Sequence, residues 1–282
     1  MNLTLTYFYQ SGFAIGVNKS LLVFSYYENK DIADESLYRL STSELRAFES
    51  IYFFIPNICR EHLEPAIFAD EFKALPVKYI ISSDVVERHV ANTVHIKNIN
   101  AYVDSDKVIR AEVGDRLSFP EMQVEVCKSS GLGVSFFIRL PKLNIFHAGD
   151  LNNWHWCDEQ DEAEAEKARL SFVEAVNSLP DEPIDLCMFP VDPKLGGQYQ
   201  AGARAFMANK KIKVFVPMHW HDEYDRIMEF ARASEFSESK ICLLCNPRDS
   251  VIIDFSGETP RFKKNTLISE DESGILSLNN AI

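Results

Sequence analysis

Hydrophobic residues in the first half of the chain either alternate with polar ones or gather in short apolar runs. Both patterns are typical of β-strands. They predict strands at 3–9, 13–17, 21–27, 51–55, 78–81, 108–113, 122–127, 134–140 and 143–146. Two helices interrupt them. One begins near Glu64 or Pro65, since proline is tolerated in a first helical turn, and Asp84 caps a second that runs to about residue 91.

The second half of the chain alternates between helices and strands. Apolar residues at helical spacing and acidic residues in the first turns predict a long helix over 158–179, which Pro180 ends. Further helices are predicted at 200–209 and 223–234, and strands at 184–190, 214–217, 241–245 and 251–255. Because no linker or repeat divides the chain, we expect one domain over residues 1–264 with two sheets and outer helices. Residues 265–282 read as a polar C-terminal tail.

Charge and composition exclude several classes of function. The 282 residues carry 29 Lys and Arg against 42 Asp and Glu, so the net charge is 29 − 42 = −13. An acidic chain is a poor general binder of nucleic acid, which requires basic surface. No apolar run approaches the ~20 residues of a membrane span, and no signal peptide is visible. We therefore expect a cytoplasmic protein that acts on or binds a small molecule, whereas the sequence leaves the oligomeric state open.

Metal-binding types of side chain follow four of the predicted strands. They lie in the segment from Asn57 to His62, in the Ser129–Gly133 turn, in the segment from His147 to Trp156, and at His219 and His221. Loops at strand ends are where α/β folds hold ligands. Histidine, aspartate and glutamate are the residues that bind zinc, manganese or iron.

Three motifs carry a resemblance to a known family: FHAGDLNNWHW at 146–156, PVDPKLG at 190–196 and VPMHW at 216–220. With them, the chain resembles the metallo-β-lactamase superfamily, in particular its uncharacterised bacterial metal-dependent hydrolases, from about residue 3 to about 255. The resemblance implies an α+β fold, a four-layer αββα sandwich of the metallo-β-lactamase type.

The metal motif departs from the family's pattern. Where that family has His-x-His-x-Asp-His after a strand, this chain has Asn57, Cys59, Glu61 and His62. A further carboxylate position of the family is Gly131 here. The bridging aspartate is kept as Asp150 and the late histidine as His219. The metal positions at Asn57, Cys59 and Gly131 are thus degenerate, and we expect no tightly held metal in that half.

By the resemblance, the other half of the metal centre keeps a full set of ligands. The resemblance implies that Glu61, His62, Asp150 and His219 bind one divalent metal, with zinc as the first choice, and that Glu61 and Asp150 act in catalysis. The predicted function is therefore a metal-dependent hydrolase of unknown substrate. The alternative is a pseudoenzyme or binding protein without metal, whose polar groups satisfy one another by hydrogen bonds.

Several neighbouring residues have weaker roles. His147 is expected to pack or to hold a ligand residue by a hydrogen bond. Asp192, in the PVDP segment, is expected to hold its loop or a ligand residue. The possible substrate pocket takes in the remaining aromatic and histidine side chains near these loops, namely Trp154, His155, Trp156, Trp220 and His221, together with His147. Restoring all the lost ligands together is expected to raise activity.

Overall fold

A computed structural model describes residues 1–28, 40–90, 105–156, 161–232, 238–264, 268–270 and 276–278 of the chain, without the side chains of 88–90, 264, 268–270 and 276–278. Within these ranges the strands form two large sheets and one two-stranded ladder. Two stacked sheets with helices outside them are the arrangement that the sequence predicts.

The first sheet has the order β15-β14-β1-β2-β3-β4-β5-β6. β1, β2 and β3 form an antiparallel meander, after which β4, β5 and β6 add in parallel. The carboxyl ends of β3, β4 and β5 therefore meet at one edge of the sheet. The strands span Asn2–Tyr7 (β1), Phe13–Val17 (β2), Ser20–Phe24 (β3), Ser50–Ile55 (β4), Val77–Ser82 (β5), Val108–Ala111 (β6), Ser250–Asp254 (β14) and Arg261–Lys264 (β15).

The second sheet has the order β13-β12-β11-β10-β9-β8-β7. β10, β11, β12 and β13 are parallel, whereas β7, β8 and β9 are antiparallel. The loops that follow β10, β11 and β12 thus leave the same edge. The strands span Arg116–Ser118 (β7), Gln123–Lys128 (β8), Val134–Leu140 (β9), Leu143–His147 (β10), Ile184–Pro190 (β11), Ile212–Met218 (β12) and Lys240–Ile241 (β13).

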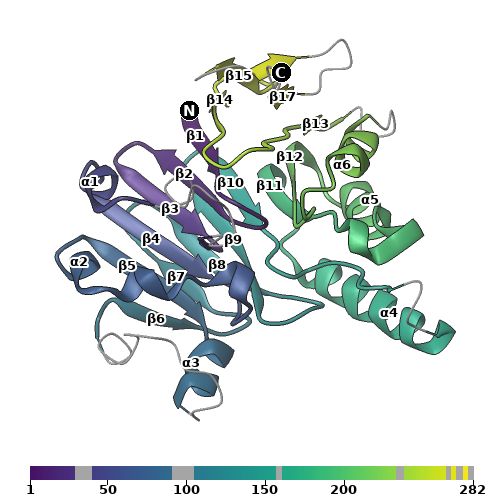
Figure 1. The fold of residues 1–282 in the computed structure, drawn as a ribbon, viewed down its shortest axis with the longest axis horizontal. Helices are drawn as coiled ribbons and strands as arrows, with labels where there is room; N and C mark the ends of the chain where they lie inside the picture. The colour runs from purple at the N-terminus through teal and green to yellow at the C-terminus, as the bar shows by residue number, and fades with distance from the viewer. Residues whose placement is uncertain are drawn as a thin grey trace.

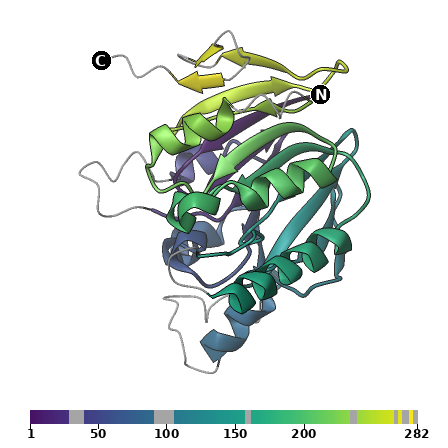
Figure 2. The same ribbon diagram turned by 90° about the vertical axis from the view of Figure 1, so that its right-hand side faces the viewer.

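Helices cover the outer face of each sheet (Figures 1 and 2). On the second sheet these are α4 (Glu162–Ser178), α5 (Ala201–Asn209) and α6 (Tyr224–Ala231). On the first they are α1 (Thr42–Leu45), α2 (Asp70–Lys73) and α3 (Ser83–Val90). The order helix, sheet, sheet, helix is the four-layer αββα sandwich that the family resemblance implies.

Two apolar clusters hold the layers together. The larger fills the space between the sheets and the space under α4, α5 and α6, where Phe24 stacks on Phe54 and the edge of Phe136 meets Phe54. The smaller lies between the first sheet and its outer helices, around Phe68 and Tyr79. Each sheet therefore buries both of its faces, which explains the continuous apolar runs of β4 and β11.

Some predicted boundaries are wrong. The helix predicted near Glu64 is the 3-10 helix η3 (Pro65–Phe68), with α2 after it. α3 begins at Ser83, and the buried carboxylate oxygens of Asp84 make no hydrogen bond, so Asp84 is not its cap. The predicted strand 241–245 shrinks to β13, whereas β7 was not predicted.

The start of the long helix and the C-terminal tail also differ from the prediction. α4 begins at Glu162, because Asp161 and Glu164 form a capping box there, and residues 157–160 lie outside the described residues. In the described part of the tail, β16 (Ile268–Glu270) pairs with β17 (Leu276–Leu278) in a two-stranded ladder. None of the helices in the described ranges is long and apolar enough to cross a membrane.

Candidate metal centre

The candidate residues lie in loops at the carboxyl ends of parallel strands from both sheets. Glu61 and His62 belong to the 3-10 helix η2 (Arg60–His62), which follows β4. Asp150 follows β10, Asp192 follows β11, and His219 follows β12 directly. Because β10, β11 and β12 are neighbours in one parallel sheet, their loops converge on one rim.

Asp150 is held between residues of the other loops. Its Oδ1 lies 2.8 Å from His62 Nε2, and its Oδ2 accepts a 2.8 Å hydrogen bond from Asn57 Nδ2. The other ring nitrogen of His62, Nδ1, lies 2.8 Å from Ser25 Oγ. Gly149 sets the backbone here with φ +54°, and a Cβ on it would lie 2.5 Å from Val134 O. Both oxygens of Asp150 and both nitrogens of His62 therefore have protein partners.

His219 stands between two acidic groups. Its Nε2 lies 3.7 Å from Glu61 Oε1, and its Nδ1 lies 3.1 Å from Asp192 Oδ2. The side chain of Glu61 is 34% exposed, whereas that of Asp192 is 1% exposed. The edge of Trp154 meets the His219 ring at 5.7 Å between ring centroids. The imidazole is thus fixed by contacts on several sides.

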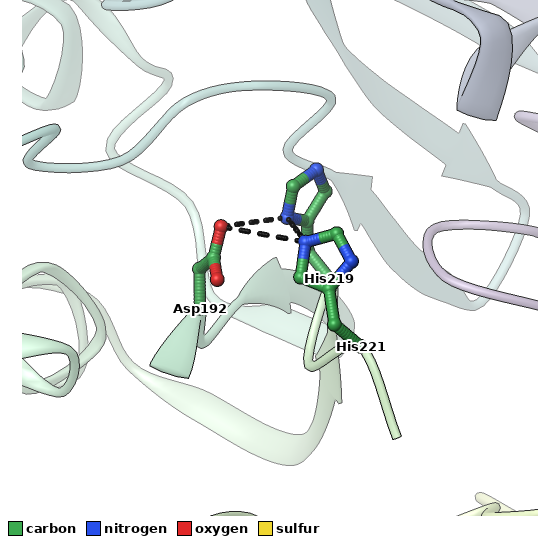
Figure 3. A group of neighbouring side chains, drawn as sticks. All are labelled: Asp192, His219 and His221. Carbon is green, nitrogen blue, oxygen red and sulfur yellow. Dashed lines mark hydrogen bonds and ion pairs between the residues drawn. The ribbon is translucent and has the colours of Figure 1, made fainter. Parts of the chain in front are cut away.

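His221 joins His219 and Asp192 in a compact group, which is drawn in Figure 3. Its Nε2 lies 3.1 Å from His219 Nδ1 and 3.6 Å from Asp192 Oδ2. The loop reaches this shape through left-handed backbone at His219 (φ 63°), His221 (φ 50°) and Asp222 (φ 64°). Non-glycine residues in this region are strained, and such residues cluster at functional sites.

The charges of the group support one another. Burial alone would lower the pKa of His219, but its hydrogen bond to Asp192 and the nearby carboxylate of Glu61 outweigh burial and raise that pKa to about 9. The neighbouring His219 imidazole lowers the pKa of Glu61 to about 2. The pKa of Asp192 also falls, because its bonds to His219 and His221 outweigh the effect of burial. At neutral pH His219 is an imidazolium between two carboxylates.

Two of the degenerate positions, Asn57 and Gly131, are closely surrounded by protein atoms. Asn57 is buried, donates to Asp150 and accepts from the Cys59 backbone N–H at 2.8 Å. A Cβ on Gly131 would lie 2.6 Å from Asp150 O and 2.8 Å from Trp154 Nε1. Trp154 Nε1 itself donates to Asp150 O at 2.6 Å. A side chain at Gly131 would therefore displace the backbone of Asp150 or the indole of Trp154.

The other predicted residues take different places. His147 is fully buried, with Nε2 3.0 Å from Ser11 O, and burial lowers its pKa to about 3. Trp220 is buried and stacks on Tyr7. Trp156 stacks on Trp154, and both are half-buried. His155 is half-buried, and its backbone N–H donates to Asn153 O. His147 and Trp220 thus belong to the packed interior rather than to an open pocket.

The structure arranges the four predicted metal ligands as two pairs, His62 with Asp150 and Glu61 with His219. Within the described ranges, one group of three or more metal-type side chains has all its ligand atoms within 4.8 Å of one another, namely Asp192, His219 and His221. Two imidazoles and a carboxylate are a donor set that fits a divalent cation. Asp192 and His221 are not among the predicted ligands, although Asp192 lies in the PVDPKLG motif and His221 directly follows VPMHW.

Comparison with known proteins agrees with this architecture. No family model matches the chain, and no curated protein matches it in sequence. Igni18, a novel metallo hydrolase from the archaeon Ignicoccus hospitalis, is similar over 91% of this chain and 100% of its own, with 17% identity and a TM-score of 0.58. The metallo-β-lactamase fold protein YhfI from Bacillus subtilis is similar over 87% of this chain and 97% of its own, with 12% identity and a TM-score of 0.54.

The same architecture also occurs in a protein with a different reaction. CmlA, a diiron β-hydroxylase from Streptomyces venezuelae, is similar over 88% of this chain and 53% of its own, with 11% identity and a TM-score of 0.53. At such identities the likeness shows the fold alone. The chain therefore has the metallo-β-lactamase fold, as its motifs predict, and its reaction has to be argued from its own site.

Proposed function

We propose that the protein is a metal-dependent hydrolase that uses one divalent cation, zinc in the first instance, bound through His219. The observation that carries the proposal is the convergence of Asp192, His219 and His221 beside the acidic side chain of Glu61. Three protein ligands with a further position open are typical of catalytic rather than structural zinc. The similarity of the fold to that of Igni18, described as a metallo hydrolase, supports the class of reaction.

The residues around His219 would have different roles in hydrolysis. A divalent cation supplies Lewis-acid polarisation and makes water more acidic. Glu61 is ionised at neutral pH and partly exposed, so its carboxylate can accept a proton from an attacking water. Asp150 is fixed by His62 and Asn57 and keeps a negative charge beside the site. Trp154 packs against the His219 ring and limits its movement.

The substrate is proposed to be a small molecule with a hydrolysable bond. The test compares the protein as purified, after chelation, and after one equivalent of Zn²⁺ or Mn²⁺ is returned. Each form is assayed with generic ester, lactone, thioester, β-lactam and phosphodiester substrates. Hydrolysis that disappears on chelation and returns with the cation supports the proposal. Hydrolysis by the chelated protein at the same rate would contradict it.

One observation favours a second candidate, a binding protein without metal. Asp150 and His62 already satisfy each other and are capped by Asn57 and Ser25, which is how buried polar groups stay stable without an ion. In that case the positive charge of His219 replaces the charge of the cation between Glu61 and Asp192. Calorimetric titration separates the candidates, because the binding protein would show no saturable uptake of divalent cations.

A further inference from the structure

The two nitrogens of the His219 ring face two different sets of side chains. Nε2 faces Glu61, in the direction of the ligand set that the family resemblance implies. Nδ1 faces Asp192 and His221. One imidazole binds a cation through one nitrogen and keeps a proton on the other. Which nitrogen binds therefore decides where the cation of the proposed function lies.

The groups on the Nε2 side are already paired with one another. Asp150 Oδ1 and His62 Nε2 are 2.8 Å apart, and Asn57 Nδ2 occupies Asp150 Oδ2. His62 is fully buried, and Ser25 Oγ meets its Nδ1. A cation here would have to break the contact between His62 and Asp150, and the amide donor of Asn57 would remain directed at the carboxylate. The Nε2 side is therefore organised as a hydrogen-bonded network.

The groups on the Nδ1 side have the spacing of ligands around one ion. The distances among His219 Nδ1, His221 Nε2 and Asp192 Oδ2 are 3.1, 3.1 and 3.6 Å. Atoms bound to one tetrahedral zinc at about 2.0–2.1 Å are about 3.3–3.4 Å apart. The three donors therefore need only small shifts to share a cation, and the fourth position would face away from the three.

The loop that carries both histidines is held in its strained shape. The His219 backbone N–H donates to Gln10 O at 3.2 Å, and Tyr9 Oη donates to Asp222 Oδ2 at 2.9 Å. Between the two histidines, Trp220 is buried against Tyr7. Left-handed backbone at a histidine is sparsely populated and persists only where the surroundings impose it. These contacts keep both imidazoles on the side of Asp192.

We propose that the divalent cation is bound by Asp192, by Nδ1 of His219 and by Nε2 of His221, a site displaced from the one that the family resemblance implies. The proposal rests on the proposed function for the presence of a cation and adds its ligands. Binding through His221 Nε2 leaves the proton on Nδ1, so the exposed Lys194 ammonium, 3.4 Å from that atom, turns toward solvent. Glu61 then stays outside the ligand set and faces the protonated Nε2 of His219.

The direct test identifies the nitrogen that binds. Protein labelled with ¹⁵N-histidine is recorded by two-bond ¹H–¹⁵N correlation with and without one equivalent of Zn²⁺. The signals are assigned from the His219→Asn and His221→Asn variants, since asparagine tolerates left-handed backbone. We expect His219 to carry its proton on Nε2 and His221 on Nδ1 in the zinc form. A zinc form of His219 with its proton on Nδ1 would overturn the proposal.

A pair of variants gives an independent answer through affinity. His221→Asn removes a ligand of the proposed site, so the Kd for Zn²⁺ measured by calorimetry should rise more than about 100-fold, beyond the cost of losing an outer partner. Glu61→Gln should change that Kd less than about 10-fold. Loss of affinity in Glu61→Gln, with or without loss in His221→Asn, would make Glu61 a ligand and overturn the proposal, but the proposed function would stand. A wild-type protein that binds no zinc would overturn both.

Discussion

Among the changed positions of the metal motif, Glu61 is the most conservative replacement. It is also the one whose carboxylate has a role in the proposed reaction. It keeps the negative charge of the aspartate that the family has there, on a side chain one methylene longer. The His219 ring lies 3.7 Å from its Oε1, and a third of its side chain is exposed. The carboxylate can therefore reach water beside His219 without leaving its 3-10 helix.

This position predicts the effect of removing the charge. Glu61→Gln keeps the size of the side chain but cannot accept a proton, and a general base contributes about 10²- to 10⁴-fold. We expect kcat/KM for metal-dependent hydrolysis to fall by at least 100-fold in a variant that still folds. Glu112→Gln, an exposed residue far from the rim in sequence, is the matched control. Equal activity in both variants would remove Glu61 from the mechanism.

His219 predicts a pH dependence for the stability of the metal-free protein. Its folded pKa of about 9 lies above the ordinary value of 6.5, so its charge stabilises the fold fully below pH 6.5. That contribution is lost as the pH rises through 9. We expect the free energy of unfolding to fall by roughly 2–3 kcal/mol between these limits, since one pKa unit is about 1.4 kcal/mol.

Urea unfolding at several pH values measures this dependence, and His219→Asn is the control. Glu61 and Asp192 contribute in the opposite pH range. Because their pKa values are lowered in the folded protein, their charges stabilise the fold at pH values above their ordinary pKa, and this effect is lost in acid. The variant should show a flat profile between pH 6.5 and 9. A wild-type profile that is equally flat would mean that His219 is neutral in the folded protein.

At the scale of elements, the loops after β4, β10, β11 and β12 build the site, and the sequence predicts their positions well. Buried strands such as β4 and β11 end at prolines, so the residues that follow them could be assigned to one rim. The contact of His221 with Asp192 could not be predicted, because it depends on positive φ angles at residues other than glycine. β13, with two residues, and β7, with three, are also too short to be predicted from a pattern of apolar residues.

The turn before β9 (Val134–Leu140) carries a prediction about Gly131. A Cβ there would lie 2.6 Å from Asp150 O and 2.8 Å from Trp154 Nε1, closer than side chains normally approach. Gly131→Ala should therefore lower the free energy of unfolding by about 1–3 kcal/mol, as overpacking does. Gly197→Ala is the control, because its Cβ would meet nothing within 4 Å. Urea unfolding with equal losses in both variants would contradict the crowding at Gly131.

The same contact changes an expectation drawn from the family motif. Restoring the lost ligands at Asn57, Cys59, Glu61 and Gly131 was expected to raise activity. An aspartate at Gly131 cannot reach a metal unless the backbone of Asp150 and the indole of Trp154 move. The loss of this ligand and the packing of the loop after β10 are therefore coupled, which a motif comparison of single positions does not reveal.

At the scale of the whole molecule, both large sheets contribute loops to the rim. The faces of the sheets are buried against each other and against the outer helices. The fold was predictable because the apolar runs, their spacing and the GDLNNWHW segment all agree with one architecture. The extent of the tail was harder to predict. β15 pairs with β14 in the first sheet, whereas β16 and β17 form a separate ladder among the strands that the structure describes.

This topology predicts that residues 265–282 are dispensable for folding. A chain of residues 1–264 keeps β15 and both apolar clusters, so its free energy of unfolding should stay within about 1 kcal/mol of the full chain and its transition should remain single. Chemical and thermal unfolding of the two chains provide the comparison. A large loss of stability on truncation would show that the tail packs on the domain.

The metal content of the purified protein tests the central claim most directly, namely that the protein binds one divalent cation rather than two or none. Elemental analysis after exposure to excess Zn²⁺ and removal of free ion should give about one equivalent per chain, and His219→Asn should give about none. Two equivalents in the wild type, or retention of the ion by His219→Asn, would contradict the account, and so would a wild-type protein that holds no divalent cation.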